Sequence, residues 1–190
     1  MGVSLPPHAS QLSSTPVEAR VEPAPSGLAP ALQRSSQEAF SRSHKGGHVV
    51  YVSRSTVNAR GVENEPEVLS AVRAAAAEHG LPVEVIASPR PLPETVRLFA
   101  SAAVVLGPHG SGLANAAFCA EGAALFELGL EGTSGLVFYS HLAAALGLRY
   151  RYITADPAKK GDTASGLRGA MLANASAVAA AVRSALQTYS

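Results

Sequence analysis

The 190-residue chain has no tryptophan, a single cysteine and few aromatic residues, and each shortage narrows the possible classes of protein. One cysteine, Cys119, excludes a framework of internal disulfides and a cysteine-rich metal site. Aromatic residues make up 5% of the sequence, so a core built from it must be mostly aliphatic. The formal net charge is only +1, which gives no electrostatic reason to expect nucleic acid or an anionic membrane as a partner.

Long apolar runs are also missing from the sequence. No run is long enough to span a bilayer, and the first residues lack a basic segment followed by an apolar one. We therefore expect neither a membrane segment nor a signal peptide in these 190 residues. The hydrophobic content of 47% is nevertheless that of a globular protein.

The chain divides into two parts by composition. Residues 1–47 are rich in Pro, Ser, Ala and Gln and show no sustained helical or strand period, which predicts a disordered leader or linker. Residues 48–190 show the periodicity of a folded domain.

Within the second part, short apolar runs alternate with amphipathic segments. The runs predict strands at 48–52, 82–87, 103–106, 123–128 and 148–154. The amphipathic segments predict helices at 66–79, 92–101, 112–120, 135–146 and 165–187. This alternation predicts an α/β domain with a doubly wound, mostly parallel sheet of Rossmann-like type.

A glycine-rich turn follows the third predicted strand, with the sequence Gly107-Pro-His-Gly-Ser-Gly-Leu-Ala-Asn115. Glycines let the backbone turn tightly, and the first amides of the following helix point outward without partners. We expect Gly110, Ser111 and Gly112 to form an anion site suited to a phosphate or diphosphate. Asn115 either stabilises this turn through its side-chain amide or reaches the ligand.

Two arginines follow the first predicted strand, in a loop that should open on the same edge of the sheet. Arg54 and Arg60 could each hold phosphate oxygens, because a guanidinium keeps its charge and presents a fork of donors. A single loop arginine is more often simply solvated, but two beside a glycine turn favour phosphate binding.

His109 and Glu127 are the remaining candidate site residues. His109 lies in the turn, where it can contact a phosphate or sugar, act as a base, or hydrogen-bond a loop carbonyl. Glu127 lies within an apolar strand, where an ionised side chain needs a partner. It could accept two ribose hydroxyls or pair with one of the two arginines.

Asn64 and Glu65 precede the first predicted helix. Asn64 is expected to cap that helix, and a carboxylate in the first turn favours the helix dipole. The role of Glu65 is left open.

Together these residues resemble the glycosyltransferase 61 family. The shared pattern is an arginine pair followed by Asn-Glu, then Gly-x-His-Gly-Ala-Gly-Leu-Thr-Asn, then an apolar-Glu-Leu strand. Ser111 and Ala114 are mild departures from it, and Glu63 stands where the family usually has an apolar residue. The resemblance covers about residues 49–152.

The resemblance implies the donor-binding half of a GT-B enzyme that takes a nucleotide sugar, usually UDP-linked. It implies inverting transfer to a hydroxyl of a glycan or protein acceptor, with no cofactor and no essential metal. It also implies a secretory location, in the Golgi or endoplasmic reticulum, and a further N-terminal domain that supplies much of the acceptor site. No catalytic base can be assigned from the residues present.

Two other classes of function fit part of the sequence. One is a non-catalytic or truncated α/β nucleotide-binding or interaction module. The other is a dinucleotide-dependent oxidoreductase, although the Gly-x-Gly-x-x-Gly fingerprint is absent after the first predicted strand, where it belongs.

Overall fold

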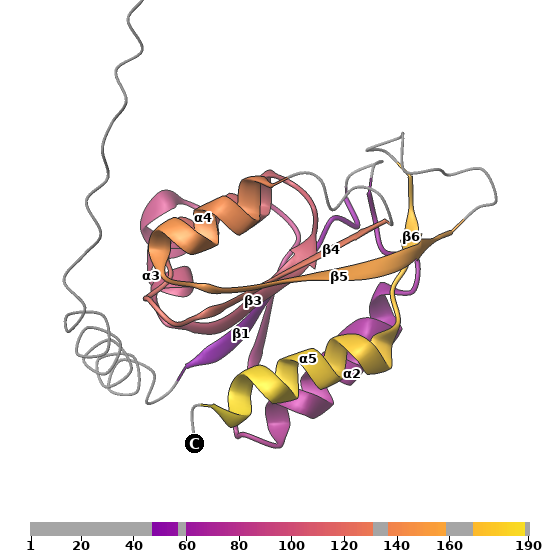
Figure 1. Cartoon of the computed structure of the whole chain (residues 1–190), viewed down its shortest axis with the longest axis horizontal. Coiled ribbons are helices and arrows are strands. Elements are labelled where there is room, and N and C mark those ends of the chain that lie inside the picture. The colour runs from indigo at the N-terminus through magenta and orange to yellow at the C-terminus, as the bar shows by residue number, and fades with distance from the viewer. Residues whose placement is uncertain (1–46, 57–59, 131–136, 159–168, 189–190) are drawn as a thin grey trace, which may run out of the picture.

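The computed structural model describes residues 47–56, 60–130, 137–158 and 169–188. The predicted leader, apart from its last residue, lies outside the described residues. Within the described residues, six strands form one curled sheet in the order β2-β1-β3-β4-β5-β6 (Figure 1). Their bounds are β1 His48–Val52, β2 Val83–Ile86, β3 Ala102–Pro108, β4 Ala124–Leu130, β5 Arg149–Pro157 and β6 Met171–Leu172.

The first five strands pair in parallel, and β6 pairs antiparallel with β5. The chain first adds β2 on one side of β1 and then adds β3, β4 and β5 on the other side. This reversal makes the sheet doubly wound, with its topological switch point between β1 and β3. The predicted α/β, Rossmann-like fold class is confirmed.

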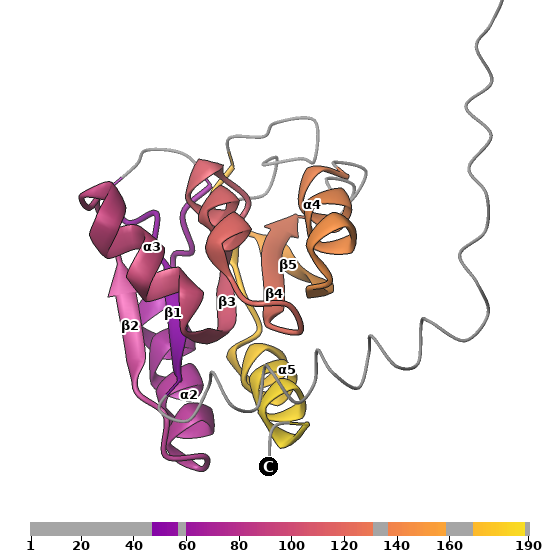
Figure 2. The same cartoon turned by 90° about the vertical axis from the view of Figure 1, so that its left-hand side faces the viewer.

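Helices cover both faces of the sheet. Figures 1 and 2 show α2 and α5 side by side against one face, with α3 and α4 against the other. A 3₁₀ helix, η1, packs with α3 and α4 on that second face. The helices are α2 Glu65–Ala77, α3 Leu92–Ala100, η1 Ser111–Phe118, α4 Phe138–Leu146 and α5 Ala175–Gln187.

The core has two layers because the central strands are buried on both faces. In β1, Val49 and Tyr51 face α2 and α5, whereas Val50 and Val52 face the other helices. The amphipathic pattern predicted over 66–79 is confirmed in α2, where four residues of one face are buried: Val68, Val72, Ala75 and Ala76.

The segment after β3 differs from its prediction. An α-helix was expected over 112–120, but residues 111–118 form a 3₁₀ helix. A 3₁₀ helix rises about 2.0 Å per residue against about 1.5 Å in an α-helix. Eight residues therefore cover about 16 Å instead of about 12 Å, which helps this short connection to run back along the seven-residue strand β3.

The prediction of one helix over 165–187 is also wrong in its first part. Residues 165–168 lie outside the described residues, Met171 and Leu172 form strand β6, and the helix begins only at Ala175. Asn174 sets this start, because its side chain accepts a hydrogen bond from Ala177 N at 3.0 Å. The amphipathic pattern predicted for the remaining part of the helix is confirmed, because Ala175, Val178, Val182 and Leu186 are buried.

Asn64 does not cap α2 with its side chain, contrary to expectation, although it occupies the N-cap position. Its amide instead bonds the backbone of Ala173, with Nδ2 donating to the carbonyl at 2.8 Å and Oδ1 accepting from the N–H at 3.0 Å. This pair of bonds mimics a strand ladder. It ties the start of α2 to the segment between β6 and α5.

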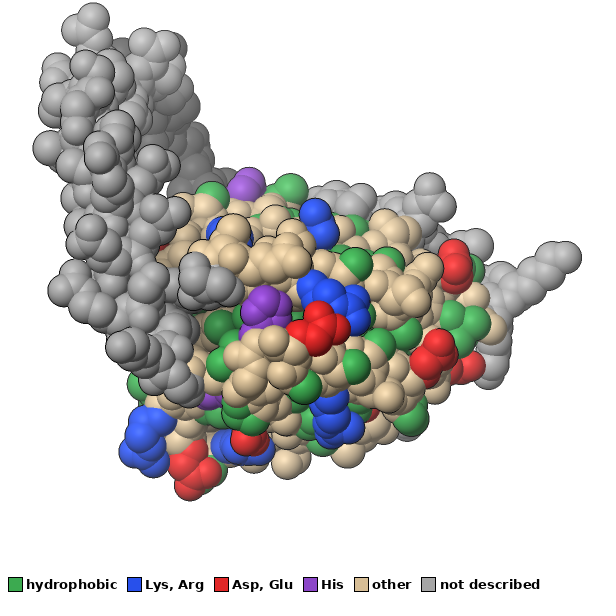
Figure 3. All heavy atoms as spheres, turned by 90° about the horizontal axis from the view of Figure 1, so that it is seen from below, with side chains coloured by type: hydrophobic (Ala, Val, Ile, Leu, Met, Phe, Trp, Pro, Cys, Tyr) green, Lys and Arg blue, Asp and Glu red, His purple; other side chains and the backbone are tan. Residues whose placement is uncertain are grey.

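The outer face of α2 and α5 carries no single dominant charge among the described residues. Figure 3, which views the molecule from that side, shows charged side chains of both signs scattered among hydrophobic ones. Arg183 of α5 and Glu78, at the end of α2, form an ion pair at 2.8 Å. Both side chains are partly exposed, so this pair adds little stability.

Asn64→Ala is expected to lower the free energy of unfolding by about 1–3 kcal/mol, because the Ala173 N–H and carbonyl lose their partners in a buried position. Urea denaturation followed by circular dichroism measures the change. Ser70→Ala, at an exposed position of the same helix, is the control and should change stability by less than about 0.5 kcal/mol. Equal effects of the two substitutions would contradict the role assigned to Asn64.

Candidate functional site

The predicted site residues lie near the carboxyl ends of β1 and β3, with Glu127 beside them on β4. Arg54 lies two residues beyond β1, and His109 directly follows β3. Glu127 lies in the middle of β4, opposite Gly107 of β3 in the sheet register. In doubly wound sheets this edge, at the switch point, is where ligands bind.

Two glycines of the turn are needed for close approach of neighbouring groups. A Cβ added to Gly107 would lie 2.4 Å from the backbone oxygen of Val52, so the strand end tolerates no side chain there. A Cβ added to Gly110 would lie 2.1 Å from Nη1 of Arg54. The guanidinium of Arg54 therefore lies directly against the backbone of the glycine turn.

The start of η1 faces the same edge. The first amides of a 3₁₀ helix have no acceptor within the helix, and here they belong to Ser111 and Gly112. The Asn115 side chain donates from Nδ2 to the Gly112 carbonyl at 3.1 Å. Asn115 thus takes the turn-stabilising role, and its contact with a ligand stays a prediction.

The two arginines are electrostatic neighbours. Burial, and then the charge of Arg60, lower the pKa of Arg54, while Tyr139 acts in the opposite direction. Arg60 adopts a left-handed backbone conformation with φ of 60°, which is uncommon for a residue other than glycine. Its Nε atom is buried without a hydrogen-bond partner in the structure. Such a group is costly unless something else binds it.

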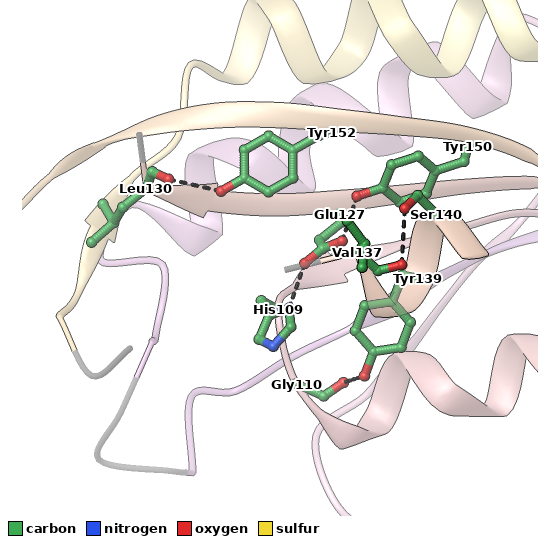
Figure 4. Close-up of polar contacts among 9 residues, drawn as sticks. All are labelled: His109, Gly110, Glu127, Leu130, Val137, Tyr139, Ser140, Tyr150 and Tyr152. Carbon is green, nitrogen blue, oxygen red and sulfur yellow. Dashed lines mark hydrogen bonds and ion pairs between the residues drawn. The ribbon is translucent and has the colours of Figure 1, made fainter. Parts of the chain in front are cut away.

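Glu127 is fully buried, yet both of its carboxylate oxygens have partners. Oε1 contacts Nδ1 of His109, and Oε2 accepts a hydrogen bond from the Tyr150 hydroxyl at 2.5 Å (Figure 4). Burial, the hydrogen bond to Glu127 and the charge of Glu127 all raise the pKa of Tyr150. Its phenol therefore stays protonated and acts as a donor. The predicted contacts of Glu127 with ribose or arginine stay predictions.

Tyr139, from the first turn of α4, closes the site on the other side of His109. Its ring meets the imidazole edge-on at a centroid distance of 5.4 Å. Its hydroxyl donates to the Gly110 carbonyl at 2.5 Å, which links α4 to the glycine turn. Burial and the charge of Glu127 raise the pKa of Tyr139, against the opposing charges of Arg60 and Arg54.

Glu65 anchors the loop that carries the arginines. Its carboxylate accepts hydrogen bonds from Ser53 Oγ at 2.7 Å and from the Tyr51 hydroxyl at 3.3 Å. Tyr51 faces the α2–α5 layer of the core, so this contact lies on the other face of the sheet from Glu127. We interpret Glu65 as a residue that holds the arginine loop in place, whereas Asn64 holds the start of α2.

Sequence reasoning missed Tyr139 and Tyr150. A signal for Tyr150 was present, because Tyr150 and Tyr152 alternate along β5 and so point to one face of the sheet. The register sets Tyr150 beside Leu125 and Tyr152 beside Glu127. Their hydroxyls then bond Glu127 and the Leu130 carbonyl.

The described residues hold no cluster of three or more His, Cys, Asp or Glu side chains that could bind a metal ion. Within the same residues, no helix combines the length and apolar character needed to cross a bilayer.

Comparisons with known proteins identify a family. The model of a family described as Glycosyltransferase 61 matches residues 6–126, more than half of the chain. The match begins inside the predicted leader and ends one residue before Glu127, so it includes both arginines and the glycine turn. Among curated proteins no match was found. One solved structure, a flavodoxin-like domain from Synechococcus sp., has 13% identity and a TM-score of 0.44, covering 74% of this chain and 94% of that one.

Gly107→Ala is expected to destabilise the protein by about 1–3 kcal/mol, because the new methyl group would collide with the Val52 carbonyl and push β1 and β3 apart. Gly61→Ala is a matched control, since nothing lies within 4 Å of the added atom. Chemical denaturation of both variants measures the difference. A Gly107→Ala protein as stable as the control would rule out the close approach.

Proposed function

We propose that this chain, which belongs to the glycosyltransferase 61 family, binds the donor substrate of the reaction, a nucleotide sugar, at the carboxyl ends of β1, β3 and β4. Family membership makes it a glycosyltransferase sequence. The observation that carries the donor site is the contact of the Arg54 guanidinium with the backbone of the glycine turn. It joins a fixed positive charge to a set of outward-facing amides.

The diphosphate is the part of the donor that this arrangement suits best. Amides at a helix start and an arginine fork are both donors to phosphate oxygens. The Nε atom of Arg60 has no hydrogen-bond partner in the structure, and the positive charges of the two arginines repel each other. A bound anion would relieve both costs. One phosphate would lie against the backbone of Gly110, Ser111 and Gly112. Both phosphates would be surrounded by the side chains of Arg54, Arg60 and His109.

An exposed aromatic ring at the rim offers a place for the base. Phe138, the first residue of α4, is 66% exposed, and its ring lies 6.5 Å from that of His109. An exposed aromatic ring beside a phosphate site can stack on a base, because every base has a π-face. We assign Phe138 as the stacking surface for the base, taken to be uracil.

The proposed reaction is an inverting transfer. An acceptor hydroxyl forms a bond to the anomeric carbon while the bond from that carbon to the diphosphate breaks. The electron pair leaves with the nucleoside diphosphate, and the hydroxyl proton goes to a base that remains unassigned. Arg54, Arg60 and the turn amides would stabilise the charge that grows on the leaving group, without a metal ion.

The remaining features of the proposal follow the family. The described domain would be the donor half of a GT-B enzyme, and an acceptor domain would complete it. The acceptor would be a hydroxyl of a glycan or protein in the secretory pathway. If this chain binds the donor but does not transfer the sugar, that result would favour the alternative of a non-catalytic nucleotide-binding module.

Titration calorimetry with UDP and with uridine tests the diphosphate site. UDP should bind at least about tenfold more tightly than uridine, and Arg54→Ala should weaken UDP binding by about 10- to 100-fold while leaving uridine unaffected. Arg73→Ala, an exposed arginine on α2 across the sheet, is the control. No UDP binding by a folded wild-type protein at millimolar concentration would refute the proposal.

Phe138→Ala is expected to weaken UDP and uridine binding alike, by about tenfold, because both ligands carry the base that stacks on the ring. Phe118→Ala is the aromatic control, at an exposed position near the end of η1 that leads away from the site. The same calorimetric titrations measure both variants. A loss confined to UDP would show that Phe138 does not contact the base.

A further inference from the structure

We propose that Glu127 acts on the donor through His109 and does not itself touch the ligand. In this assignment Glu127 is a positioning residue: it accepts a hydrogen bond from Nδ1 of His109, so that Nε2 faces the diphosphate, and an imidazolium donates a hydrogen bond to the diphosphate from Nε2. The inference rests on the proposed function, because it concerns the same donor site. It assigns His109 the role of a hydrogen-bond donor to the diphosphate.

The burial of Glu127 is the first reason. The side chain is fully removed from solvent, and each of its oxygens already contacts a donor. A ribose could reach the carboxylate only by displacing His109 or Tyr150. Removing a partner from a buried carboxylate is strongly unfavourable, so the ligand would have to replace that contact fully.

The contact with Glu127 determines which ring nitrogen of His109 carries a proton. An ionised carboxylate can only accept hydrogen bonds, so Nδ1 of His109 must carry a proton. The other ring nitrogen, Nε2, lies on the side of the ring away from Glu127 (Figure 4). It is left to the ligand, to which the imidazolium presents a donor.

The position of the ring is fixed from several sides. Tyr139 packs edge-on against the imidazole, and the backbone N–H of His109 donates to the Leu128 carbonyl at 2.9 Å. The His109 side chain is only 14% exposed. A donor held in this way is aimed before the substrate arrives, which is the arrangement that stabilises developing charge most effectively.

The surrounding charges give the second reason. Arg54 and Arg60 influence Tyr139, whose ring packs against that of His109, so an imidazolium at His109 would be repelled by two nearby guanidinium groups. The negative charge of Glu127 offsets that repulsion from the inner side, while Tyr150 remains a neutral donor to the carboxylate. Glu127 thus allows a third cationic group beside the diphosphate.

A double-mutant cycle separates this assignment from direct contact with ribose. Glu127→Gln should weaken UDP binding by about tenfold in the wild-type background and cause no further loss in a His109→Gln background. Calorimetry with 2′-deoxy-UDP completes the test, and Glu127→Gln should weaken it as much as UDP. Equal losses in both backgrounds, or a loss that spares 2′-deoxy-UDP, would overturn the assignment.

A ligand-free measurement guards against a folding defect. Long-range ¹H–¹⁵N spectra of the ligand-free protein should show a proton on Nδ1 in the wild type and in Tyr150→Phe, which keeps the carboxylate. In Glu127→Gln the amide can donate to Nδ1, so the neutral Nε2–H tautomer, which lacks the positive charge of the imidazolium, should appear. An unchanged tautomer in a folded Glu127→Gln protein would contradict the inference. A wild type that binds no UDP would instead overturn the proposed function on which it rests.

Discussion

A carboxylate that is completely removed from water needs hydrogen-bond donors on both oxygens. This requirement determines how the side chains are arranged at the carboxyl edge of the sheet. Glu127 finds one donor in His109, at the end of β3, and the other in Tyr150, on β5. Three neighbouring strands are thereby joined on one face by a single side chain. Breaking such a buried pair costs about 3–5 kcal/mol, so the arrangement is stiff as well as polar.

Glycine residues leave room for a positively charged side chain near Glu127 and its two hydrogen-bond partners. Without a side chain, Gly110 leaves room for the guanidinium of Arg54 against the turn, and its carbonyl accepts from Tyr139. Gly107 allows β3 to lie close to β1 at the point where both strands end. The site therefore combines backbone amides, fixed cations and a buried anion within one edge of a parallel sheet. This combination suits a ligand with a doubly charged diphosphate linkage and a neutral sugar.

The sequence predicted the fold class, because the periods of strands and helices are local signals. It predicted the buried face of α2 for the same reason. It also predicted that site residues far apart in the chain lie close together, because the carboxyl ends of parallel strands share one edge of the sheet. It failed where a tertiary contact decides the outcome. Asn64 looked like a helix cap but bonds Ala173, more than a hundred residues away. The partners of Glu127 depend on the register between β4 and β5, which no local pattern states.

The proposed donor site requires that the glycine turn and Arg54 together hold the diphosphate of a nucleotide sugar. An NMR titration of the ¹⁵N-labelled protein with UDP tests it most directly. The amide signals of Gly110, Ser111 and Gly112 and the side-chain Nε–H signal of Arg54 should shift first and together, with no change along α5. Saturating UDP that leaves these signals in place, or shifts only residues on the α2–α5 face, would contradict it.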